Sequence, residues 1–197
     1  AKEGGLIEVN TTTVVYFLNT MTDNYPVELK YYQGNGSNIS KIDIYKKFYT
    51  VDTSGLPVSS DKIFYKSLDL STFTQPGYET YNAKFADLAA GTTINGTLIP
   101  QDDTLLTAGF YWELTYDIIL DDGRHVVVPQ KTVFINSRYA GKYRVIDALY
   151  YRLGVLTYDI ADWPAEVTVT ALNSTTFKME APCEPFLSNS IYFTIDD

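Results

Sequence analysis

One stretch of the sequence, Phe110 to Ile135, limits the possible folds of this chain more than any other. Apolar and polar residues alternate along its first half, which is the pattern of a β-strand with one buried face. The Asp122-Gly123 pair that follows suits the positive backbone torsions of a tight two-residue turn. The apolar positions of the first strand are Trp112, Leu114, Tyr116, Ile118 and Leu120. The stretch therefore predicts a long β-hairpin with one apolar face.

The turn residues also predict the register of the hairpin, and its apolar face predicts a partner sheet. A two-residue turn places Leu120 opposite His125. Further from the turn, the same register places Ile118 opposite Val127. Pro129 cannot donate to a ladder, so we expect regular pairing to falter there. Because an isolated hairpin is marginally stable in water, a second sheet must cover the apolar face.

Several β-prone runs precede the hairpin and supply this second sheet. Tyrosine suits strands and half-wet surfaces, and the chain has 17 Tyr against 10 Phe and 2 Trp, which favours an all-β protein. We interpret Lys41, Lys46 and Lys47 as the solvent side of one strand, where they protect a sheet edge. The predicted strands span 6–9 and 13–18 (one strand with a bend), 27–32, 39–51 and 63–70.

The best helical candidate is Tyr81 to Ala90. Phe85, Leu88 and Ala89 share one face of such a helix, and Gly91 is suited to terminate it.

The segment Asn136 to Gly141 is the predicted boundary between two domains, residues 1–139 and 140–197. The first is predicted to be a β-sandwich and the second a small antiparallel β-meander. At its size the second domain has barely enough core, so it either leans on the first or continues beyond Asp197. Its predicted strands span 143–149, 155–160, 166–172, 175–180 and 191–195, with Asn173-Ser174 as a hairpin turn.

Charge and composition exclude several function classes. A formal charge of −9 and a pI near 4.5 disfavour nucleic acid, whose phosphates require a basic face. No apolar run is long enough to cross a bilayer. A lone cysteine, Cys183, provides neither a disulfide framework nor a zinc cluster, and we expect it to be a partly buried small residue.

The order of these features resembles a known group of proteins. An aromatic strand, the turn Asp122-Gly123-Arg124, a KTVF return strand and then GKYRV are similar to surface lipoproteins of Bacteroidetes. The segments 89–94 and 107–109 share this resemblance. It implies an immunoglobulin-like first domain, a genomic setting near glycan-uptake systems, and export to the periplasm or the outer-membrane surface. It also implies a lipid-anchored cysteine upstream of Ala1.

Few groups in the sequence are candidates for catalysis or metal binding. Asp102-Asp103 and Asp121-Asp122 are clustered carboxylates, but neither pair has the spacing of a calcium loop, and turn residues are the commoner reading. The same pairs are candidates for the acid and base of a glycosidase, which needs two carboxylates across one bond. His125 is predicted to be a hydrogen-bonded structural imidazole rather than a general base. No glycine-rich phosphate loop, metalloprotease motif or nucleophile elbow is present, so no cofactor, metal or catalytic residue is predicted.

The aromatic residues of the second domain are the candidate ligand-binding residues: Tyr150, Tyr151 and Trp163. Adjacent Tyr150 and Tyr151 point to opposite faces of an extended chain, so at least one should be exposed. Exposed rings stack on sugars or anchor protein interfaces. For Trp163, which precedes Pro164, filling the small core is the favoured interpretation.

Together these features predict a non-catalytic, exported binding or scaffold module at a bacterial cell surface, with glycan capture as one candidate role. The alternatives are a structural or adhesive module that binds a protein and, less favoured, a hydrolase that uses loop carboxylates.

Overall fold

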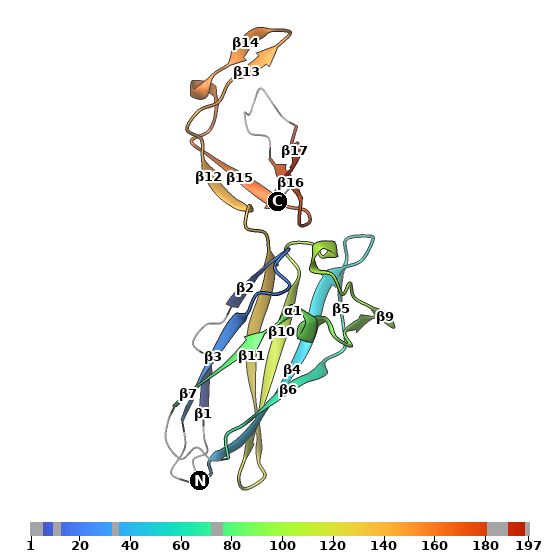
Figure 1. Cartoon of the computed structure of the whole chain (residues 1–197), viewed down its shortest axis with the longest axis vertical. Helices are drawn as coiled ribbons and strands as arrows, with labels where there is room; N and C mark the ends of the chain where they lie inside the picture. Colours follow the sequence, from blue (N-terminus) through green and yellow to red (C-terminus); the bar gives the residue numbers. More distant parts are fainter. Residues whose placement is uncertain (1–5, 10–12, 33–35, 72–76, 181–188, 196–197) are drawn as a thin grey trace.

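The computed structural model describes residues 6–9, 13–32, 36–71, 77–180 and 189–195. Nearly all regular structure among them is β, so the predicted all-β fold is confirmed. The strands form two groups of sheets that follow one another along the long axis of the molecule (Figure 1).

The first group is a sandwich of two sheets. A three-stranded sheet has the order β1-β3-β7, and a six-stranded sheet has the order β2-β11-β10-β4-β5, with β6 also paired to β4. All pairs are antiparallel except β2–β11, which is parallel. The strands are β1 (Leu6–Val9), β2 (Thr13–Phe17), β3 (Tyr25–Tyr32), β4 (Ile39–Val51), β5 (Pro57–Ser59), β6 (Ile63–Asp69), β7 (Gly77–Ala83), β10 (Tyr111–Leu120) and β11 (His125–Asn136).

The predicted bent first strand is divided between the two sheets. Its first half, β1, pairs with β3, and its second half, β2, runs parallel to the end of β11. Leu18 continues this pairing, since its N–H donates to the Asn136 carbonyl at 2.8 Å. One chain segment therefore belongs to both layers of the sandwich and holds them together at one edge.

The core lies between these layers and is centred on Trp112. The alternation predicted for β10 is confirmed, because Trp112, Leu114, Tyr116, Ile118 and Leu120 are all buried. The Trp112 ring contacts Phe48 of β4, with centroids 4.7 Å apart, and Phe85, with centroids 6.1 Å apart. Residues of the three-stranded sheet belong to the same core cluster, namely Val27, Leu29 and Tyr31 of β3 and Tyr81 of β7, so the predicted second sheet covers the apolar face of the hairpin.

The predicted register of the β10–β11 hairpin is wrong by one residue. Ile118 lies opposite Val126, not Val127, and Ile119 rather than Leu120 lies opposite His125. The turn has three residues: the Gly123 N–H donates to the Leu120 carbonyl, and Leu120 N–H donates to the Arg124 carbonyl. Gly123, the third residue of the turn, has φ +83°, and this left-handed residue adds one position to the loop.

The interruption predicted at Pro129 is confirmed. Leu114 pairs with Lys131 and Tyr116 pairs with Val128, so Thr115 alone faces two residues of β11, Pro129 and Gln130. This is a β-bulge, and it places the proline where its missing N–H disturbs no regular pair.

The helix prediction is right for its second half only. α1 spans Phe85–Ala89 with Phe85, Leu88 and Ala89 buried, and Gly91 follows it with φ +67°. Tyr81 instead belongs to β7, where burial alternates with a period of two. Tyr81 and Phe85 are both buried and lie four residues apart in the sequence. This spacing fits one long helix as well as the observed strand followed by a helix.

Lys46 also contradicts the prediction that it lies on the solvent side. It is 3% exposed and points into the sandwich between Ile44 and Phe48. Its Nζ donates to the carbonyls of Asp87 and Ala90, at 2.5 and 2.7 Å, and so satisfies the end of α1. β4 has neighbours on both sides, so its lysines do not protect a sheet edge.

Short elements connect β7 to β10 across the end of the sandwich. They are the ribbon β8 (Thr93–Ile94) and β9 (Thr97–Leu98), and the 3-10 helix η1 (Asp103–Leu105).

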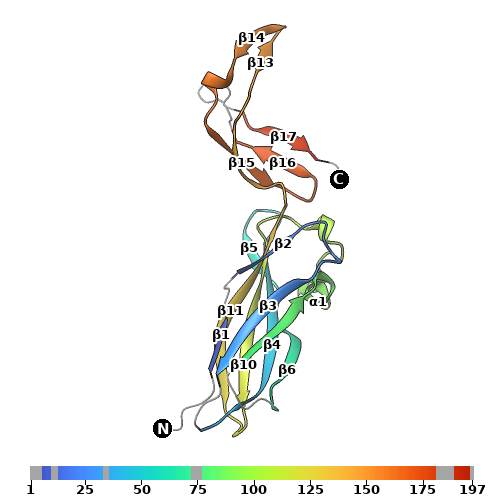
Figure 2. The ribbon, with the colours of Figure 1, turned by 60° about the vertical axis from the view of Figure 1, so that its left-hand side comes forward.

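The second group of sheets begins after residues 137–140. A four-stranded antiparallel sheet has the order β12-β15-β16-β17, and a separate two-stranded hairpin, β13–β14, extends beyond it (Figures 1 and 2). The antiparallel meander is thus confirmed, but the predicted strand 143–149 is wrong, because the chain leaves the sheet after β12. The elements are β12 (Gly141–Arg144), β13 (Tyr150–Arg152), β14 (Val155–Tyr158), η2 (Ile160–Asp162), β15 (Glu166–Ala171), β16 (Thr176–Met179) and β17 (Ile191–Thr194).

The second group leans on the first through a small contact. The Ser174 hydroxyl donates to the Thr104 carbonyl at 3.2 Å, and Ala108 contacts apolar residues of both groups. Tyr139, in the connection, packs its ring edge-on to Phe177 with centroids 6.0 Å apart. Asn173 forms the predicted turn between β15 and β16, where its side chain accepts from the N–H groups of Thr175 and Thr176.

Candidate functional site

The outer face of the six-stranded sheet carries a pair of stacked tyrosines. β4 and β10 are neighbours, with Phe48 opposite Trp112 and Tyr49 opposite Tyr111. Successive side chains of a strand point to opposite faces, so Phe48 and Trp112 enter the core while the two tyrosines face outward. The tyrosine rings are half-buried, their centroids are 4.8 Å apart, and their planes differ by 14°.

The next strand extends this pair into a row. Phe134 of β11 lies opposite Tyr111, and Val15 of β2 lies beside Phe134. Phe134 is half-buried and Val15 is 39% exposed. We name Tyr49, Tyr111 and Phe134 the aromatic row. It crosses three adjacent strands and so is held by the hydrogen-bonded sheet rather than by loops.

Charged groups of both signs border the aromatic row. The Lys47 Nζ lies 5.0 Å from the centre of the Tyr49 ring, a cation–π contact. Lys47 is directly opposite Glu113 on the same outer face. A ligand on the row therefore meets a hydrogen-bond donor and an acceptor at its edge.

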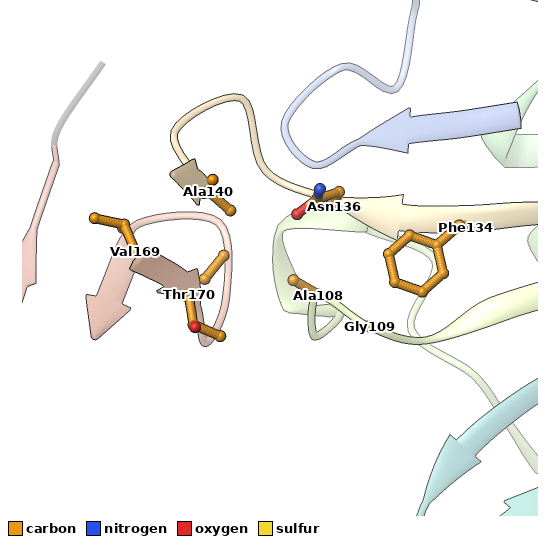
Figure 3. Close-up of a pocket in the computed structure, with 9 residues that line it drawn as sticks. Ala108, Gly109, Phe134, Asn136, Ala140, Val169 and Thr170 are labelled. Carbon is orange, nitrogen blue, oxygen red and sulfur yellow. The ribbon is translucent and has the colours of Figure 1, made fainter. Parts of the chain in front are cut away.

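Two shallow hollows flank the row. One, of about 260 Å³, is lined by Tyr49, Tyr111, Val51, Pro57 and Gly109, with Thr50 and Phe110 completing it. The other, of about 270 Å³, lies between the two groups of sheets, and Figure 3 shows residues of both around it. Its lining includes Phe134 and Asn136 on one side and Ala140, Val169 and Thr170 on the other.

Gly109 lines both hollows, and the hollow between the two groups of sheets adjoins the aromatic row at Phe134. The walls of that hollow are mainly apolar, with the Asn136 amide and the Thr170 hydroxyl as polar groups. A mainly apolar depression with a few polar groups is typical of small-molecule binding sites. This one is open and shallow, which suits a ligand that lies along the surface.

The predicted ligand-binding residues occupy the second group of sheets, away from the aromatic row. Tyr151 is 56% exposed on β13. Tyr150 is half-buried and stacks on Tyr158 of β14, with centroids 5.7 Å apart. Trp163 is half-buried after η2, with its indole nitrogen buried and without a hydrogen-bond partner. The structure therefore does not gather the three rings into one exposed surface, and a ligand-binding role for them stays a prediction.

The carboxylates of the predicted pairs lie in different surroundings. Asp102 is exposed and caps η1 by accepting from the Thr104 N–H, whereas Asp103 is fully buried. The Ser37 hydroxyl and then Arg124 hydrogen-bond to Asp122 and lower its pKa to about 2, against a smaller effect of burial. Each of these three carboxylates thus has a local structural role.

His125 is hydrogen-bonded, as predicted. Its Nδ1 lies 3.0 Å from Asp117 Oδ2 on the outer sheet face, where Asp117 is directly opposite Asp43. Burial is the largest single effect on the pKa of Asp43 and raises it, but the hydrogen bonds from Ser67 and Lys41 together hold this pKa below its usual value. The histidine and both carboxylates are engaged with protein partners.

The described residues hold neither a candidate metal site nor a candidate membrane-spanning helix. No cluster of three or more His, Cys, Asp or Glu side chains there is arranged to hold a metal ion. None of the helices in the described ranges has the length and apolar character needed to span a membrane. Cys183 lies outside the described residues.

The aromatic row is the part of the candidate site that the sequence did not reveal. The alternation in β4 is a usable signal, because it puts Tyr45, Lys47 and Tyr49 on the face opposite Ile44 and Phe48. The stacking of Tyr49 on Tyr111 depends on the register of two strands far apart in the chain, and no local pattern specifies that register.

Comparison with known proteins adds little to this geometry. No protein-family model matches the chain, and no curated protein matches it. Among solved structures, the chain is similar to Spo0M, a sporulation control protein from Bacillus subtilis, with 10% identity over 98% of this chain and 91% of that one. The TM-score is 0.34, and a similarity of this size supports no conclusion about function.

Proposed function

We propose that this chain is a non-catalytic binding module, exported to a bacterial cell surface, that captures glycans on the aromatic row. The observation that carries the proposal is the stacked pair Tyr49–Tyr111 on the outer sheet face, with Phe134 beside it. The rigid neighbouring strands fix these rings before any ligand arrives, so binding costs little side-chain ordering.

The chemistry of the row matches that of a sugar chain. A pyranose ring has an apolar C–H face, which stacks on flat aromatic rings, and a rim of hydroxyl groups. Lys47 and Glu113 lie at the border of the row, and Asn136 and Thr170 line the adjoining hollow. These groups are suited to hydroxyl recognition. An open row favours an extended glycan over a small molecule that needs enclosure.

The test is binding of the purified chain to a broad glycan panel, with affinities measured by calorimetry. Tyr111→Ala and Tyr49→Ala are expected to weaken binding by at least about tenfold, the effect typical of a central aromatic contact. Tyr78→Ala is the matched control, because Tyr78 is 63% exposed on β7 of the other sheet. Saturable binding that survives both row substitutions would reject the aromatic row as the site.

The same panel separates this proposal from the role predicted for the second domain. Tyr151→Ala and Trp163→Ala should leave binding to the aromatic row unchanged. If they abolish binding while the row substitutions do not, glycans are captured by the second domain instead.

A protein-binding structural or adhesive module is the second candidate function. It is favoured by the exposed apolar side chains of the β13–β14 hairpin, where Leu153 of the turn is 97% exposed and Val155 of β14 is 67% exposed. Exposed apolar side chains at one end of a molecule are typical of protein contact sites.

A further inference from the structure

The second group of sheets leaves much of its apolar surface in water. In its described part only Val169, Ala171 and Phe177 are buried hydrophobic residues. A core this small gives little stability without additional packing. Large apolar side chains that are exposed there are Tyr143, Ile146, Leu149, Tyr151, Leu153, Val155, Leu156, Ile160, Ile191 and Tyr192.

The β13–β14 hairpin concentrates this surface at one end of the molecule, far from β1, in both Figure 1 and Figure 2. Tyr151 pairs with Leu156 and Arg152 with Val155, so one face carries Tyr151 and Leu156 and the other carries Val155. The hairpin pairs with no other described strand. A two-stranded ribbon of this kind is marginal in water unless something covers it.

The turn of this hairpin displays a leucine where a polar residue fits better. Leu153 and Gly154 have φ +51° and +80°, the torsions of a two-residue type I′ turn. The first position of that turn favours Asn, Asp or Gly, and a leucine there is strained. An unfavourable turn residue that is 97% exposed and apolar is best explained by contact with a partner.

The hairpin has its positive charge at the turn and negative charges at its base. Arg152, next to the turn, is the sole charged residue from Tyr150 to Tyr158, in a chain of net charge −9. Asp159 and Asp162 follow directly at the base of the hairpin. If two hairpins lie antiparallel about a two-fold axis, the Arg152 end of each meets the acidic base of the other, as an isologous interface requires.

We propose that two copies of this chain associate through their β13–β14 hairpins about a two-fold axis. Tyr151 and Leu156 of one copy pack on the same face of the other hairpin, while Leu153 and Arg152 at the turn of each hairpin lie against the acidic base of the partner copy. This association is independent of glycan binding on the aromatic row.

Sedimentation velocity over about a hundredfold range of protein concentration tests the proposal, because a dimer forms by mass action. The unsubstituted chain should shift from monomer to dimer. Leu153→Asn should raise the dimer dissociation constant at least tenfold, while it suits the type I′ turn and so keeps the hairpin folded. Leu56→Asn is the matched control, since Leu56 is 62% exposed in a loop of the sandwich.

Charge substitutions test the orientation of the two hairpins. Arg152→Glu should weaken the dimer, as should high salt. Asp159→Asn should also weaken it, and Asn can still cap η2. Tyr111→Ala should dimerise normally even if it binds no glycan. A chain that stays monomeric at every concentration overturns the proposal, and so does a dimer unaffected by Leu153→Asn. The partner of the hairpin would then be another protein or a membrane.

Discussion

The hydroxyl oxygens of Tyr81 in β7 and Tyr116 in β10 lie 2.9 Å apart in the interior of the sandwich, where they join its two sheets. Tyr81 is 6% exposed and Tyr116 is fully buried. Burial raises the pKa of Tyr116 to about 12 and that of Tyr81 further still, so both phenols are neutral at ordinary pH. A polar contact thus fixes how the two sheets face each other inside an apolar core.

We expect Tyr81→Phe and Tyr116→Phe each to destabilise the fold by about 1–2 kcal/mol, because each leaves the other hydroxyl buried and unpaired. The double substitution leaves no orphan hydroxyl and should cost less than the sum of the two by about 1 kcal/mol. Urea denaturation of all four chains measures this coupling. Tyr32→Phe, whose exposed hydroxyl donates to Glu8, should be close to neutral. Strict additivity would contradict the coupling.

Features with a local cause were predictable from the sequence. The inward alternation of β10 and the bulge at Pro129 depend on residues within one hairpin, and both are confirmed. The predicted hairpin register is wrong because Gly123 is the left-handed third residue of a three-residue turn, and an Asp-Gly pair suits that turn as well as the shorter one.

Features with a distant cause were not predictable. Period-two alternation puts Lys46 on the buried face with Ile44 and Phe48, but its charge argued for the solvent side. Lys46 can be buried because its ammonium group donates to carbonyls at the end of α1, about forty residues later in the chain. The pairing of Tyr49 with Tyr111 is equally distant, so the aromatic row emerged only from the sheet.

The buried Lys46 predicts a particular dependence of stability on pH. Burial lowers the pKa of its ammonium group to about 8 from the ordinary 10.5, and the charge of Asp87 opposes this. Between these pH values the unfolded chain binds more protons than the folded one, so the free energy of unfolding rises with pH. The full rise attributable to Lys46 is at most about 3 kcal/mol.

Lys46→Met removes the titrating group, so the rise between about pH 8 and 10 should be smaller in this variant than in the unsubstituted chain. Urea denaturation at several pH values measures the difference between the two chains, which cancels the contribution of shared groups. Lys47→Met is the control, because Lys47 lies on the outer face and should leave the profile unchanged. Parallel profiles for Lys46→Met and the unsubstituted chain would contradict the assignment.

The buried hydrogen bonds of Asp103 lead us to expect a large loss of stability from a conservative substitution at this position. Its Oδ2 accepts from the Tyr16 hydroxyl at 2.6 Å and from the Thr20 N–H at 2.9 Å, and the side chain is fully buried. These bonds attach η1 to the end of β2. Asp103→Asn keeps the shape but replaces a charged acceptor with a neutral one and buries an amide group without a partner. We expect it to cost about 1–3 kcal/mol.

Tyr16→Phe should destabilise the fold by a similar amount, because it removes the hydrogen bond to the same carboxylate oxygen. The two substitutions share one interaction, so their combination should cost less than their sum. Asp102→Asn is a matched control at the adjacent position, since an exposed Asn still caps η1, and its denaturation midpoint should not move. If Asp103→Asn is as stable as Asp102→Asn in urea denaturation, the carboxylate of Asp103 does not hold η1 to β2.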